Sequence, residues 1–173
     1  MLQMSKIFIG LAFWNVVLFG VTIWLGVTHH SSHWQHQAVG VLTGIYTCLT
    51  HSIVMMHFMG SGKGIKEAVE GHGLPDDPRT GYVRRTKKFK GRTSGLATLG
   101  CLLTIAAVWL GGAKDVGMSK GMAHAWLSYA VVVFNIYAFW VEYKVIAENT
   151  AMIREINTKI TAAGTSSTPS PRP

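Results

Sequence analysis

The sequence predicts an all-α integral membrane protein: a single four-transmembrane-helix bundle with both termini in the cytoplasm. Three observations predict it. Four apolar runs contain no Lys, Arg, Asp or Glu, most of the positive charge lies in one connection between them, and histidines gather at the opposite end. The runs cover residues 7–27, 38–58, 94–110 and 122–141. Each is close to the roughly 20 residues that cross a hydrocarbon layer, and helices cross it without leaving backbone groups unpaired.

The first run, residues 7–27, follows Lys6, which is also how a signal peptide begins. It is longer than the apolar region of a signal peptide, however, and the histidines and serines at 29–32 are not a small-residue cleavage site. We therefore expect it to remain as the first helix. A short connection leads to the second run, 38–58, and short connections make antiparallel neighbours.

The connection between the second and third runs, residues 60–93, holds most of the basic residues. They are Lys63, Lys66, Arg79, Arg84, Arg85, Lys87, Lys88, Lys90 and Arg92. Cytoplasmic loops carry such an excess of Lys and Arg, so we expect this loop and both termini inside, in a multi-pass protein of the inner (cytoplasmic) membrane. A basic run beside a helix attracts anionic lipid; a docking site for an acidic partner is the alternative.

The fourth run, residues 122–141, continues into a segment, 142–162, without Pro or Gly. Ile146, Ile153 and Ile160 recur in it at heptad spacing, which predicts that the last helix extends into the cytoplasm with an apolar stripe. The loop, a second copy or a partner subunit would have to cover that stripe. We expect one domain over residues 1–162 and, because residues 163–173 are rich in Ser, Thr and Pro, a disordered tail.

Composition and missing motifs exclude several classes of function. At 173 residues and 49% hydrophobic, the chain is too apolar for a soluble domain and too short for a large transporter. The net charge of +8 follows the topology and no nucleic-acid-binding motif is present, so no nucleic-acid partner is expected. The spans hold no ionised side chain for a pump and no nucleophile with an oriented base. We expect no catalytic residue, and at most an electron-transfer subunit.

Histidines at the predicted outer end are the first candidate site. His29, His33 and His36 have i, i+4, i+7 spacing, would share one face of a helix, and are candidate ligands for copper or zinc. His36 and His124 each begin a helix that runs inward, at a matching level, and can clamp a b-type haem from two sides. Interfacial histidines without a cofactor are the alternative.

His51 is the second candidate, because it lies inside an apolar run. Asn15, Thr104 and Asn135 fall at a broadly similar depth, one on each of the other spans. Strongly polar side chains in a membrane turn toward the interior of a bundle. His51 is therefore a candidate haem ligand, quinone-site donor or proton relay, and the alternative is a hydrogen-bonded layer that fixes the register of the helices.

The two halves of the chain also resemble each other. Trp24-Leu25-Gly26 ends the first span as Trp109-Leu110-Gly111 ends the third, and His36 and His124 then begin the second and fourth. Two explanations fit this similarity: a parallel repeat of two-helix hairpins about an axis along the membrane normal, or chance similarity among apolar helices.

Together these features predict an integral membrane subunit of a larger redox or respiratory complex that binds haem b or a quinone for electron transfer. In helix count and histidine placement the layout is similar to the small cytochrome b-like anchors of respiratory enzymes, although no family motif matches residue by residue. The expected partners are the lipid bilayer and other membrane subunits. A cofactor-free accessory or assembly subunit, and copper or zinc binding at the outer face, are the alternatives.

Overall fold

The computed structural model describes residues 2–28, 33–79, 81–118 and 121–166, and in this part of the chain it is all helical, with no strand. The helices are α1 (Leu2–Thr28), α2 (His33–Gly71), α3 (Tyr82–Asp115) and α4 (Gly121–Ser166). All four are long and apolar enough to cross a membrane. The predicted class, a bundle of four such helices, is therefore confirmed.

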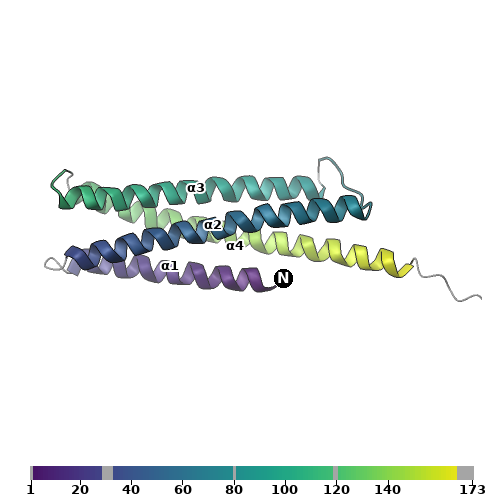
Figure 1. Ribbon diagram of the computed structural model, residues 1–173, viewed down its shortest axis with the longest axis horizontal. Coiled ribbons are helices and arrows are strands. Elements are labelled where there is room, and N and C mark those ends of the chain that lie inside the picture. The colour runs from purple at the N-terminus through teal and green to yellow at the C-terminus, as the bar shows by residue number, and fades with distance from the viewer. Residues whose placement is uncertain (1, 29–32, 80, 119–120, 167–173) are drawn as a thin grey trace, which may run out of the picture.

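The helices pack in the order of the chain, with α1 also against α4, so that α2 and α4 occupy opposite corners of the bundle (Figure 1). We call the end where α1 leads into α2 and α3 leads into α4 the hairpin end. Both α2 and α4 begin there and run in the same direction. Side chains on these two helices can therefore meet across the axis of the bundle at equal depth.

Beyond the start of α1, the other three helices continue together (Figure 1). We call this part, residues 60–71 of α2, 82–92 of α3 and 149–163 of α4, the stalk. The 46 residues of α4 span about 69 Å at 1.5 Å per residue, more than twice the hydrocarbon thickness of about 30 Å.

The stalk corrects the prediction of a long loop over residues 60–93. In the structure α2 runs to Gly71 and α3 begins at Tyr82, so the connection shrinks to residues 72–81. The glycines at 60, 62 and 64 are poor helix formers, but Ile65, directly after them, and Val69, one turn further on, are buried. Their burial, about 1.5–3 kcal/mol for each side chain, outweighs the low helix propensity of the glycines.

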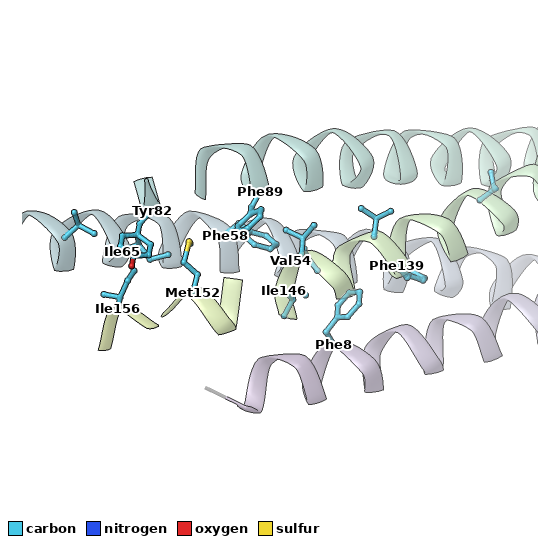
Figure 2. Close-up of a cluster of buried hydrophobic side chains, with 14 of the residues drawn as sticks. Phe8, Val54, Phe58, Ile65, Tyr82, Phe89, Phe139, Ile146, Met152 and Ile156 are labelled. Atoms are coloured by element: carbon cyan, nitrogen blue, oxygen red, sulfur yellow. The ribbon is translucent and has the colours of Figure 1, made fainter. Parts of the chain in front are cut away.

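The isoleucine stripe of α4 is covered by this same segment. Ile146 and Ile156 are fully buried, and Ile153 and Ile160 pack against the same cluster (Figure 2). The sequence left three candidates to cover the stripe: the connection between the second and third spans, a second copy, or a partner subunit. In the structure, the connection covers it. The helix also extends to Ser166, so residues 163–166, expected in a disordered tail, are helical; the rest of that tail lies outside the described residues.

The bundle exposes many large apolar side chains and buries several polar ones beside its apolar core. Its exposed side chains include Phe13, Trp14, Ile45, Leu102, Ile105 and Val133, and its buried ones include Asn15, Thr47, Thr50, His51, Thr104 and Asn135. Soluble proteins show the reverse pattern. Four tryptophans, Trp24, Trp34, Trp109 and Trp126, are exposed around the hairpin end, the position of an aromatic belt at a membrane interface.

Candidate functional site

His36 and His124 meet at the hairpin end. Each lies in the first turn of its helix, and because α2 and α4 occupy opposite corners, the two imidazoles face each other across the bundle. Their ring centroids are 6.0 Å apart and their planes are inclined at 74°. The structure thus brings together the pair that the sequence predicted.

A backbone carbonyl holds each imidazole in the same way. The Nδ1 atom of His36 lies 3.0 Å from the carbonyl oxygen of Thr22 on α1, and Nδ1 of His124 lies 3.1 Å from that of Ala107 on α3. A carbonyl oxygen can only accept, so in both rings Nδ1 carries the proton and donates. Histidines that bind metal ions donate their second nitrogen in this manner, which fixes the tautomer and the ring orientation.

Two glycines make room for these rings. A Cβ atom built on Gly26 would lie 2.9 Å from Cε1 of His36, and one built on Gly111 would lie 3.0 Å from Cε1 of His124. Both distances are shorter than a normal van der Waals contact. The glycines of the Trp-Leu-Gly repeat therefore have the same task in both hairpins, and the repeat in the sequence corresponds to a shared local geometry.

The copper or zinc site expected at His29, His33 and His36 cannot be assembled from the described residues. His29 lies outside them, as does the side chain of His33. Within the described residues, no group of three or more His, Cys, Asp or Glu side chains could hold a metal ion. The outer metal site stays a prediction.

His51 forms a second, fully buried cluster. Its Nδ1 atom lies 2.8 Å from Oε1 of Glu142, and its Nε2 atom lies 2.8 Å from Oδ1 of Asn135. The amide nitrogen of Asn135 donates to the carbonyl oxygen of Val131 at 2.8 Å and to Oγ1 of Thr104 at 3.3 Å. To ligate a haem, His51 would have to give up one of its two hydrogen bonds.

These contacts fix most of the protons in the cluster. The carbonyl of Val131 can only accept, so it holds the amide nitrogen of Asn135 and turns Oδ1 toward His51. Nε2 of His51 must then carry a proton and donate. One further proton lies in the hydrogen bond between Nδ1 and Glu142, on either atom, and the pair is electrically neutral as a whole in both arrangements.

The expected layer of one polar residue per span forms as two adjoining groups. Asn15 accepts from the hydroxyl of Thr47 at 2.9 Å and donates to that of Thr50 at 3.3 Å, which joins α1 to α2. Thr104 and Asn135 instead join His51. Gly100 of α3 provides the space, since a Cβ there would lie 2.7 Å from Nε2 of His51.

Glu142 was missed in the sequence because it follows directly after the fourth charge-free run. A heptad pattern could have revealed it: Asn135, Glu142 and Asn149 are seven residues apart and are all fully buried. They form one polar column on the inner face of α4. At the stalk, the amide of Asn149 donates to Oγ of Ser61 at 3.2 Å.

Further along the stalk, a tyrosine links α3 to α4. The hydroxyl of Tyr82 donates to Oε1 of Glu155 at 2.5 Å and accepts from Nζ of Lys159 at 2.6 Å. The hydrogen bond from Tyr82, together with Lys159, holds the pKa of Glu155 below its usual value. The hydrogen bonds to Tyr82 and Glu155 raise the pKa of Lys159.

Comparison of the chain with family models, with curated proteins and with solved structures found no match in any of the three.

Proposed function

We propose that this protein is an integral membrane subunit of a larger redox complex and that its bundle binds one b-type haem between His36 and His124. The observation that carries the proposal is the pair of facing imidazoles from opposite corners of the bundle, each oriented by a backbone carbonyl. We place the hairpin end outside and the stalk in the cytoplasm, because basic residues are concentrated on the stalk.

His36 and His124 are the residues that would hold the haem iron, since their ring centroids lie 6.0 Å apart. Because Nδ1 of each ring donates to a carbonyl, Nε2 is the atom of each that would bind the iron. When bound, the haem would supply a one-electron carrier.

The residues of the chain would orient and tune that carrier. The carbonyls of Thr22 and Ala107 fix the ring planes and raise the basicity of the ligating nitrogens. The low dielectric constant of the apolar surroundings, together with the two histidine ligands, would set the potential of the haem. Because Gly26 and Gly111 have no side chain, they leave the space that the imidazoles of His36 and His124 occupy.

The test is a dithionite-reduced minus oxidised absorption spectrum of the protein purified in mild detergent, without chelators and with its native partners. We expect the α-band of a b-type haem at about one haem per chain. His36→Ala and His124→Ala should each abolish it, whereas the control His72→Ala, an exposed histidine beyond the end of α2, should leave it unchanged. A sample without the band, or a band that survives both changes, would refute the proposal.

A cofactor-free accessory or assembly subunit is the second candidate, and the surface of the stalk favours it. The first part of α3, residues 82–92, contains no acidic residue. Its basic side chains are all exposed: Arg84, Arg85, Lys87, Lys88, Lys90 and Arg92. Lys90 and Arg92, next to the span, would meet anionic lipid, and the four further out would meet an acidic subunit.

This candidate predicts a flat spectrum together with co-purifying subunits. Changing the four outer residues, 84, 85, 87 and 88, to glutamine should release those subunits, whereas Lys63→Gln and Lys66→Gln on α2 should retain them. Copper or zinc binding near His36 would instead show as stoichiometric metal in the purified protein that is lost in His29→Ala and His33→Ala.

A further inference from the structure

The buried His51–Glu142 pair has no part in the haem site. Building on that proposed site, we propose that the pair is a proton-binding site whose affinity for a further proton rises when the hairpin end of the bundle is reduced. The electron would come from a membrane quinol, or from dithionite in the test. The geometry of the pair, its charge and its surroundings each support this assignment.

Charge balance is the first step. With Nε2 of His51 protonated and one proton in the hydrogen bond to Glu142, the pair is neutral. A second proton, bound at the carboxyl group, converts it to an imidazolium beside a carboxylic acid, with a net charge of +1. A net charge in a low-dielectric interior is costly unless an opposite charge accompanies it, and an electron added to the bundle is such a charge.

The point of entry is the second step. Oε2 of Glu142 is buried and has no hydrogen-bond partner among the described residues, and the same is true of Oδ1 of Asn149. Asn149 lies one heptad along α4 toward the stalk, about 10 Å away at 1.5 Å per residue. The two oxygens lie on one buried face of α4, and each would accept a hydrogen bond from a water molecule of its own. The proton would therefore reach Oε2 of Glu142 from the aqueous phase on the stalk side.

The other charged or titratable groups around the pair are few. Cys101 on α3 lies near Glu142, with Cys48 of α2 beside it. By position in the sequence, the others are Lys6, the charged residue of α1, His57, six residues beyond His51 on α2, and Lys144, two residues beyond Glu142 on α4. Lys6 and Lys144 are exposed. The interior of the membrane-spanning part thus presents one carboxyl group to a proton, and the imidazole bonded to it shares the resulting charge.

The size of the coupling follows from the helix geometry. Fifteen residues of α2 separate His36 from His51, about 22 Å at 1.5 Å per residue. Unit charges at that distance, with an effective dielectric constant of about 20, change a proton affinity by a factor of about three. Converted at 59 mV per tenfold change, the haem midpoint potential should vary with pH by a total of about 30 mV.

Potentiometric titration of the holoprotein at a series of pH values tests the coupling. We expect the midpoint potential to fall by that amount as pH rises through the titration of the pair. Glu142→Gln should abolish the fall. Glu148→Gln, which changes an exposed glutamate on the same helix, should retain it. An equal pH dependence in Glu142→Gln, or none in the unaltered protein, would overturn the inference while leaving the haem site intact.

An infrared difference spectrum of the unaltered protein provides a readout that needs no variant to fold. On reduction with dithionite, a carboxylic-acid C=O band should appear, if Glu142 begins as a carboxylate, or change its frequency, if it begins protonated. In both cases this band should shift in deuterium oxide, and specific 13C labelling of glutamate should move it as well. A reduced haem spectrum without this band refutes the inference alone. If the protein shows no haem spectrum, the proposed function fails, and the redox coupling fails with it. Proton binding by the pair is then tested by acidifying the protein. If the carboxylic-acid band does not respond to acidification either, proton binding is refuted too.

Discussion

Gly100→Ala should destabilise the bundle although it adds only one methyl group. The new Cβ would lie 2.7 Å from Nε2 of His51 and 3.1 Å from Oδ1 of Asn135. The imidazole cannot move aside freely, because hydrogen bonds of 2.8 Å hold both of its nitrogens. To restore a carbon contact of about 3.5 Å, the ring must shift and lengthen at least one of these bonds.

The expected loss of stability is the sum of three contributions. Overpacking a buried site costs about 1–3 kcal/mol, and a weakened buried hydrogen bond costs about 1–3 kcal/mol more. Alanine recovers about 1 kcal/mol of helix propensity relative to glycine. The net loss is about 1–5 kcal/mol. Since each kcal/mol corresponds to about 2–4 °C in a chain of this size, the midpoint of this range, about 3 kcal/mol, gives a decrease in Tm of about 6–12 °C.

Thermal unfolding in a single detergent, followed by tryptophan fluorescence, measures this loss. The matched control is Gly95→Ala on the same helix, where a Cβ would meet nothing within 4 Å. That variant should unfold at or slightly above the temperature of the unaltered protein. If Gly100→Ala were as stable as Gly95→Ala, the packing described around His51 would be wrong.

Three further predictions concern the hairpin end and the stalk. Gly111→Ala should displace the imidazole of His124, which packs against this glycine, and so lower both Tm and haem content. Gly112→Ala should change neither, because a Cβ there would meet open space. Equal haem content in the two variants would contradict the packing of His124 against Gly111. Tyr82→Phe should raise the pKa of Glu155 toward its ordinary value, because the hydrogen bond from the tyrosine hydroxyl is the largest cause of the lowering. A 13C titration of the Glu155 carboxyl group measures this pKa. An equal midpoint in the variant and the unaltered protein would contradict the prediction. In the unaltered protein the stabilising effect of this contact is present at neutral pH and is lost as pH falls through the lowered pKa. Asn149→Leu should raise Tm, because removing the buried oxygen that has no partner among the described residues outweighs losing the 3.2 Å hydrogen bond from the amide to Ser61. A lower Tm would contradict this.

The four helices that are long and apolar enough to cross a membrane could be predicted, because lipid imposes one simple rule on such segments. A run without charges and about 20 residues long has no other common explanation. The stalk could not be predicted in the same way, because the basic residues from Lys63 to Arg92 indicate only that the segment is outside the membrane. Whether such a segment is a loop or a helix depends on packing, and Ile65 and Val69 decide it through contacts with residues far away in the sequence.

The candidate site was predictable where two residues stand at equivalent positions. His36 and His124 each begin a span, and their meeting follows from helix length and parallel direction. The partner of His51 was harder to find. Glu142 lies immediately after an apolar run, where a glutamate is usually in water. Only the heptad relation to Asn135 shows that it lies on the buried face, and that relation gains meaning once the helix is known to continue.

The shared local geometry of the two hairpins bears on whether such a bundle is built from one polypeptide or from two. Each hairpin contributes one histidine, one carbonyl and one glycine, so two copies of a single hairpin, related by a twofold axis, would suffice to assemble the hairpin end. A symmetric dimer of that kind would have to carry identical residues at the deeper level. Joining both hairpins in one polypeptide removes this restriction, because His51 can face Asn135 and Glu142 without any of the three being duplicated. The covalent link thus permits the asymmetry on which an acid–base pair depends.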